Sequence, residues 1–94
     1  MIKHVVMWKF KEGTEKERDE FLTKLQGLYG VIPQIKEQEI GVDCAGGGNY
    51  GAVLISLFDS MEDLEAYKTD PRHVAVSELC KSIRESRVAV DYQV

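Results

Sequence analysis

The sequence contains two histidines, and both fall at positions that a folded chain would turn inward. His4 lies between Ile2 and Val6 on one face of a segment in which inward and outward residues alternate. His73 lies in the first turn of a predicted helix, where the helix dipole disfavours the charged ring and leaves it able to accept a proton. Tyr67, shortly before it, could donate one. If the three side chains converge, they form an acid–base site suited to moving protons on a carbonyl substrate.

The same residues also have a purely structural interpretation. An inward histidine often hydrogen-bonds a backbone carbonyl, and a buried tyrosine can be a core residue whose hydroxyl is satisfied. Trp8 also has two interpretations: its indole could wall a ligand pocket, but its size favours a place in the core. The residue types alone leave both alternatives standing.

Periodicity predicts the elements that would carry these side chains. Alternating residues predict strands at Ile2–Lys11, Ile35–Asp43, Ala52–Phe58 and Arg87–Val94. Three- and four-residue spacing predicts a helix that a Thr14–Glu17 capping box starts and that Gly30 and Pro33 end. A second helix follows Ser60 and is broken at Asp70-Pro71, where the aspartate suits an N-cap and the proline the first helical position.

This βαββαβ order is typical of a ferredoxin-like α+β domain, in which helices cover one face of a four-stranded antiparallel sheet. The strand Ala52–Phe58 is apolar on both faces, so its second face also needs a cover. The uncovered face would carry the apolar side chains Val5, Met7, Val53, Ile55 and Leu57. Because such patches mark interfaces, the sequence predicts a homodimer in which two sheets stack.

Length and composition bound the function classes. The 94 residues show no shift in composition, which favours one domain spanning residues 1–94. The net charge of −4 comes from acidic and basic residues that are intermixed along the chain. There is no basic stripe of the kind that binds nucleic acid, so a nucleic-acid partner is not expected. The apolar runs are too short to span a membrane and the N-terminus lacks a signal-peptide core, so we expect a cytoplasmic protein.

No motif in the sequence predicts a metal site or a cofactor. Cys44 and Cys80 lack ligand spacing and are expected to be free thiols, although one disulfide between them stays open. Gly46–Gly51 matches G-x-G-x-x-G, but a strand follows it where a nucleotide site needs a helix. The acidic groups Glu15–Glu20 and Glu62-Asp63 are better explained as the first turns of helices than as metal ligands.

Three segments, Lys3–Lys11, Glu65–Val74 and Val90–Tyr92, together resemble the stress-responsive dimeric α/β-barrel (Dabb) family. The most specific signal is an x-P-x-H-V segment after a tyrosine, combined with an H-x-x-x-x-x-F strand at the N-terminus. The resemblance implies a ferredoxin-like protomer whose sheet packs on a second copy to form a barrel-like dimer. The family contains plant stress proteins, bacterial members of unknown role, and a polyketide cyclase that performs an intramolecular aldol condensation without a cofactor.

The resemblance also implies roles for individual residues. In that cyclase a tyrosine and the histidine of the x-P-x-H-V segment form the acid–base pair, and they match Tyr67 and His73. His4 matches a pocket histidine on the first strand. A further pocket histidine of the cyclase corresponds to Ala52, and Trp8 replaces a leucine. We therefore expect a shorter and less polar pocket and a different substrate.

The expected pocket lies between the sheet and the helices. Its predicted lining is Val6, Trp8, Phe21, Leu25, Ala52, Leu54 and Val76. Two hypotheses follow. In one, a homodimeric Dabb protein of unassigned biochemical role binds an apolar or aromatic metabolite there. In the other, a cofactor-free, cyclase-like enzyme uses His73 as base, Tyr67 as proton donor and His4 to orient the substrate; a monooxygenase on the same barrel rests on fold analogy alone.

Overall fold

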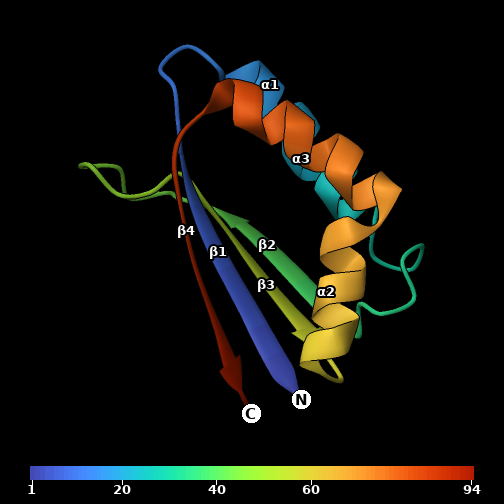
Figure 1. Ribbon diagram of the computed structural model, residues 1–94. Coiled ribbons are helices and arrows are strands. Elements are labelled where there is room, and N and C mark those ends of the chain that lie inside the picture. The colour runs from blue at the N-terminus through green and yellow to red at the C-terminus, as the bar shows by residue number, and fades with distance from the viewer.

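The computed structural model describes all residues, 1–94, as one sheet with helices against one of its faces (Figure 1). In chain order the elements are β1 (Ile2–Phe10), α1 (Glu15–Gln26), β2 (Glu37–Val42), β3 (Ala52–Phe58), α2 (Met61–Thr69), α3 (Pro71–Ile83) and β4 (Arg84–Gln93). The strands lie in the order β2-β3-β1-β4, and every neighbouring pair is antiparallel. The predicted ferredoxin-like α+β fold is confirmed.

The core lies between the helices and the face of the sheet that meets them, called here the inner face. Along β3, buried residues alternate with half-buried ones, as expected for a strand whose inner face packs under helices. Val6 and Trp8 of β1 are also buried on this face, together with Phe21 and Leu25 of α1. The opposite, outer face has no layer over it, and Met7 there is 40% exposed.

The break between α2 and α3 is formed as predicted. The Ser60 hydroxyl accepts a hydrogen bond from the Asp63 amide at 3.1 Å and caps α2. The Asp70 carboxylate accepts one from the Arg72 amide at 2.9 Å and caps α3, whose first residue is Pro71. Because Asp70 is extended between two helices, the chain turns there, and the last turn of α2 comes to lie beside the first turn of α3.

Several element boundaries and one helix cap differ from the sequence predictions. α1 ends at Gln26, before Gly30, and the capping box is wrong because the Thr14 hydroxyl donates to the Lys11 carbonyl instead of accepting a helix amide. β2 is shorter than expected. β4 begins at Arg84 and not at Arg87, because its pairing with β1 continues through a register shift at Lys9/Phe10.

The two cysteines are not joined, and the glycine-rich loop does not lead into a helix. Cys44 is exposed, Cys80 is buried, and both are free thiols, so the disulfide that the sequence left open is not formed. The glycine-rich loop leads into β3, in keeping with the rejection of a nucleotide fingerprint. None of the three helices is both long enough and apolar enough to cross a lipid bilayer.

Candidate active site

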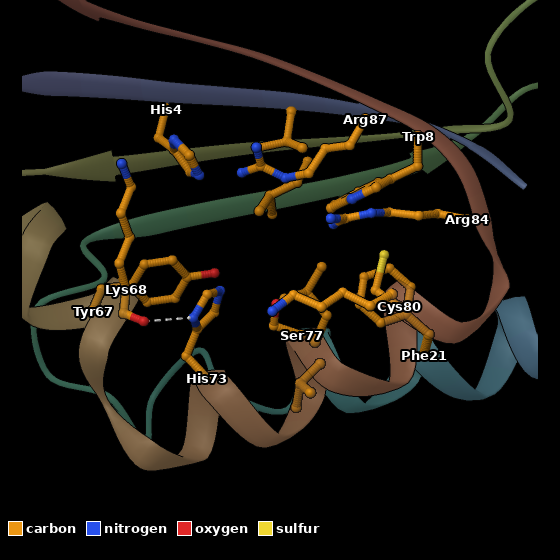
Figure 2. A pocket seen from close by; sticks show the side chains of 15 residues that line it. His4, Trp8, Phe21, Tyr67, Lys68, His73, Ser77, Cys80, Arg84 and Arg87 are labelled. Atoms are coloured by element: carbon orange, nitrogen blue, oxygen red, sulfur yellow. Dashed lines mark hydrogen bonds between the residues drawn. The ribbon is translucent and has the colours of Figure 1, made fainter.

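A cavity of about 340 Å³ lies between the inner face of the sheet and the helices α2 and α3 (Figure 2). All three of the predicted chemical residues, His4, Tyr67 and His73, line it. Six of the seven residues predicted to form its wall do so as well: Val6, Trp8, Phe21, Leu25, Leu54 and Val76. Its volume is within the range of small-molecule sites.

Ala52 is the exception, and it does not line the cavity. It is buried on the inner face of β3 and lies beside Trp8 in the β1–β3 register. Its methyl group is too short to reach the cavity past a neighbour as large as an indole. Trp8 lines the cavity without filling it.

Tyr67 belongs to the last turns of α2, and its hydroxyl points into the cavity (Figure 2). The side chain is buried, with 1% of the residue exposed, yet the hydroxyl has no hydrogen-bond partner. Burial raises the pKa of this phenol above its ordinary value of 10.0, so it stays protonated at neutral pH. A buried donor without an acceptor is costly, and a ligand oxygen would satisfy it.

His73 lies directly against Tyr67, with 4.3 Å between the ring centroids. Its Nδ1 is 3.1 Å from the Lys68 carbonyl oxygen at the end of α2. Because a carbonyl only accepts, the proton is on Nδ1 and the lone pair is on Nε2. Burial lowers the pKa of the ring below 6.5, which leaves it neutral and able to act as a base near pH 7.

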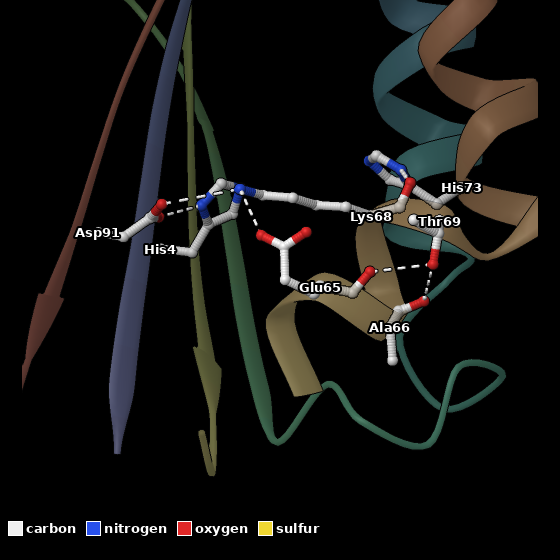
Figure 3. A network of polar contacts seen from close by, with 7 residues as sticks. All are labelled: His4, Glu65, Ala66, Lys68, Thr69, His73 and Asp91. Atoms are coloured by element: carbon white, nitrogen blue, oxygen red, sulfur yellow. Dashed lines mark hydrogen bonds and ion pairs between the residues drawn. The ribbon is translucent and has the colours of Figure 1, made fainter. Parts of the chain in front are cut away.

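His4 reaches the same space from β1, 6.3 Å from Tyr67 between ring centroids. Its Nδ1 pairs with the carboxylate of Asp91, which lies opposite it in the β1–β4 register (Figure 3). Burial lowers the pKa of His4, although Asp91 acts in the other direction. Asp91 thus fixes the proton of the neutral ring on Nδ1, and Nε2 is free to contact a ligand.

Sequence reasoning missed Asp91 as a partner of His4. The signal was present in the alternation of β4, because Val88, Val90 and Tyr92 share the outer face and Asp91 must therefore be on the inner face. Lys68 extends the network, with its ammonium 3.9 Å from Asp91 and 3.6 Å from Glu65 (Figure 3).

The cavity is also more polar than expected. Besides the predicted residues it is lined by Lys68, Ser77, Cys80, Lys81, Arg84 and Arg87. Four of these are cations and no carboxylate joins them, so the expectation of an apolar wall is wrong for this end of the cavity. The early start of β4 brings Arg84 to the cavity beside the end of α3. Arg87 was already within the predicted strand, and its inward position follows from the same alternation as that of Asp91.

The structure gathers no group of three or more histidine, cysteine, aspartate or glutamate side chains that could hold a metal ion. What the cavity does bring together is two neutral imidazoles, each with its Nδ1 proton engaged, and one protonated phenol. These groups can accept a proton, donate a hydrogen bond and hold a carbonyl oxygen.

The sequence and the fold of the chain are similar to those of several known proteins. The chain is 30% identical to olivetolic acid cyclase of Cannabis sativa, across 97% of this chain and 94% of that protein. It also resembles the crystal structure of a dimeric ferredoxin-like protein of unknown function from Bacteroides fragilis, with a TM-score of 0.85 and 28% identity over 99% of this chain and 95% of that one. The hydroxynitrile lyase of Passiflora edulis shares the fold, with a TM-score of 0.87 and 19% identity over 99% and 92% of the two chains.

A family model described as the stress responsive A/B barrel domain matches residues 2–94. The match spans every element described above, from β1 to β4, and includes His4, Tyr67 and His73. The chain belongs to the stress-responsive α/β-barrel (Dabb) family.

Proposed function

We propose that this protein is an enzyme that uses acid–base chemistry, without a cofactor, on a small carbonyl compound bound between the sheet and α2–α3. The observation that carries this proposal is the Tyr67 hydroxyl, which is buried in the cavity wall without a partner and lies against the ring of His73. A protein that only had to fold would gain stability by satisfying or removing that hydroxyl.

The chemistry follows from the atoms that face the cavity. Nε2 of His73 removes a proton from a carbon next to a carbonyl, and the electron pair of the broken C–H bond moves into an enolate. The hydroxyl of Tyr67 donates a hydrogen bond to the enolate oxygen and stabilises its charge. When the enolate carbon attacks a second carbonyl of the same molecule, the new alkoxide takes up the proton that His73 holds. Atoms and charge then balance without an external reagent.

His4 is assigned a positioning role. Its ring is fixed by Asp91 and its Nε2 is free to accept a hydrogen bond from a hydroxyl of the substrate. The similarity to olivetolic acid cyclase supports a ring-closing condensation as the reaction type. The resemblance implies that Trp8 and Ala52 differ from the corresponding residues of that relative, and we therefore propose a different, more compact substrate.

The alternative, a protein that binds an apolar or aromatic metabolite without transforming it, uses the same cavity. It explains the apolar walls contributed by Val6, Leu25 and Leu54. It does not explain why two histidines have their tautomers fixed beside an unpartnered phenol. We therefore rank the enzyme first.

The experiment that separates the two is a screen of linear di- and triketo acids and their thioesters. Deuterium incorporation at the carbon between carbonyls and the appearance of cyclised product would be followed by NMR and mass spectrometry. We expect turnover by the wild-type protein and loss of turnover in His73→Ala. Ligands that bind both proteins equally, with turnover by neither, would favour the binding protein.

We also propose that the chain forms a homodimer through the outer face of its sheet. The predicted interface residues Val5, Val53, Ile55 and Leu57 are half-buried in the protomer, and Met7 is exposed. β4 adds three exposed apolar side chains to this face, Val88, Val90 and Tyr92. The Bacteroides fragilis relative is described as dimeric, which supports this proposal.

A further inference from the structure

We infer that Arg84 and Arg87 form a binding site for a carboxylate on the small molecule that occupies the cavity. Both side chains reach from β4 into the space between the sheet and α3 (Figure 2). The inference deepens the proposed function, on which it rests for the location of the ligand. It requires the ligand to carry a carboxylate, which neither the acid–base groups nor the apolar side chains of the cavity require.

The first argument is the distribution of charge. The chain as a whole carries a net charge of −4, yet the cavity is lined by four cations and by no aspartate or glutamate. A negative protein that concentrates positive charge around one concave site creates a local attraction for anions. Because Lys68 and Lys81 are paired with carboxylates outside the lining, the uncompensated part of this charge comes from Arg84 and Arg87.

The second argument is that the two arginines lack the partners that the other cations of the cavity have. Lys81 is 3.1 Å from Glu78, and Lys68 is shared between Glu65 and Asp91. No carboxylate lies within 4.0 Å of either Arg84 or Arg87. The remaining arginines of the chain, Arg18 and Arg72, are each paired with an aspartate. The two unpaired arginines are therefore the two that face the cavity.

The third argument is position relative to the reacting groups. Arg87 lies opposite Trp8 in the β1–β4 register and so belongs to the inner face. Burial has the largest effect on both groups: it raises the pKa of Tyr67 and lowers the pKa of His73. The positive charge of Arg87 has a smaller effect and lowers both pKa values. Arg87, Tyr67 and His73 line the same cavity, so a molecule held by Arg87 can also contact Tyr67 and His73.

The chemistry of the guanidinium selects the ligand class. Its planar fork matches a carboxylate through two parallel hydrogen bonds. Arg84 is half-buried and Arg87 is exposed, so Arg84 is the more shielded of the two. The remaining lining includes the apolar side chains Val6, Leu54 and Val76. The ligand class that fits is an organic acid with an apolar or aromatic body, its carboxylate on Arg84 and Arg87 and its carbonyl toward Tyr67.

The test compares two probes of matched shape, benzoate and benzamide, which differ in charge. Binding would be followed by NMR shifts and by the fluorescence of Trp8, the sole tryptophan, which lines the cavity. We expect benzoate to bind at least about ten-fold more tightly than benzamide. The preference should disappear in Arg87→Gln and in Arg84→Gln/Arg87→Gln, and remain in Arg18→Gln, whose arginine lies outside the cavity.

Several outcomes would overturn the inference. These are equal affinity for the two probes, no binding of benzoate, or a preference that survives loss of both arginines in a protein whose circular dichroism shows it to be folded. Tighter binding of inorganic phosphate than of benzoate would assign the arginines to a phosphate and reject the carboxylate. Arg87→Lys, which keeps the charge and loses the fork, should show an intermediate preference.

The same measurements separate this inference from the proposed enzyme. Probe binding requires no turnover, so a charge preference in a catalytically inactive protein would support the carboxylate site and count against the enzyme. Turnover that depends on His73, together with equal binding of the two probes, would support the enzyme and count against the carboxylate site. In an active enzyme, Arg87→Gln should raise KM for acidic substrates more than it lowers kcat.

Discussion

At the scale of single residues, Tyr67 is the clearest sign that this cavity is built for a ligand. We predict that Tyr67→Phe leaves the free energy of unfolding unchanged or raises it by up to about 1 kcal/mol, since it removes a buried hydroxyl that has no partner. The same change should lower turnover by roughly 100-fold or more, because the hydrogen bond to the enolate is lost. Urea unfolding and the ketoacid assay measure the two effects.

Tyr29→Phe is the matched control. Tyr29 is exposed and lies outside the cavity, and its hydroxyl donates to the Lys36 carbonyl. The control should leave turnover unchanged. A Tyr67→Phe protein that is strongly destabilised would show that the hydroxyl has a structural partner in solution, and the assignment of Tyr67 as the proton donor would lose its main support.

The two histidines predict how stability and activity depend on pH. Burial holds the pKa of His4 and of His73 below 6.5, so between these lowered values and 6.5 the unfolded chain binds more protons than the folded one. The free energy of unfolding should therefore be largest above pH 6.5 and fall as the pH drops through that interval. The acid limb of the activity profile should also lie below 6.5, where His73 becomes protonated.

NMR titration of the ring protons measures both pKa values directly, because the chain has two histidines only. The lowered carboxyl pKa values of Asp43 and Asp70 act at lower pH and do not obscure this window. A histidine ring that titrates at or above 6.5 in the folded protein would contradict the prediction.

At the scale of elements, the junction of α2 and α3 decides whether Tyr67 and His73 meet. We predict that Asp70→Ala and Ser60→Ala both lower stability, because each removes an N-cap; for Ser60→Ala the loss should be about 1 kcal/mol. Turnover should fall roughly ten-fold or more in Asp70→Ala alone, since Asp70 lies between the two reacting side chains. Equal turnover in the two variants would show that this cap does not position the site.

The same junction shows what could be predicted from the sequence. Asp70-Pro71 and Ser60 carry strong local signals, and the broken helix, the strands and the inward face of His4 follow from short-range patterns. Thr14 carried a similar signal, but the nearby Lys11 carbonyl offered its hydroxyl a different partner. The early start of β4 at Arg84 depends on pairing with β1 across the whole chain, so the sequence could not place Arg84 at the cavity. Arg87 could have been placed there by the alternation of β4, as Asp91 could.

At the scale of the whole molecule, the outer face of the sheet determines the state of association. We predict a dimer at micromolar concentration and a monomer for Val90→Lys, because a lysine buried between two apolar sheets would have no partner. Association should weaken by at least about 100-fold. Val74→Lys is the control, since Val74 is an exposed valine of α3 and does not belong to the sheet. Light scattering gives the mass of each protein, and a monomeric wild-type chain would refute the proposed interface.

The pairing of His4 with Asp91 joins residues that are 87 positions apart in the chain. The strand that carries Asp91 also carries Arg84 and Arg87, and of the seven elements it is the last to leave the ribosome. A nascent chain can therefore form α1, β2, β3 and much of the helical layer while the cavity still lacks one wall. The site is completed only when β4 pairs with β1, so a chain truncated before β4 yields a product that cannot bind or act on the substrate.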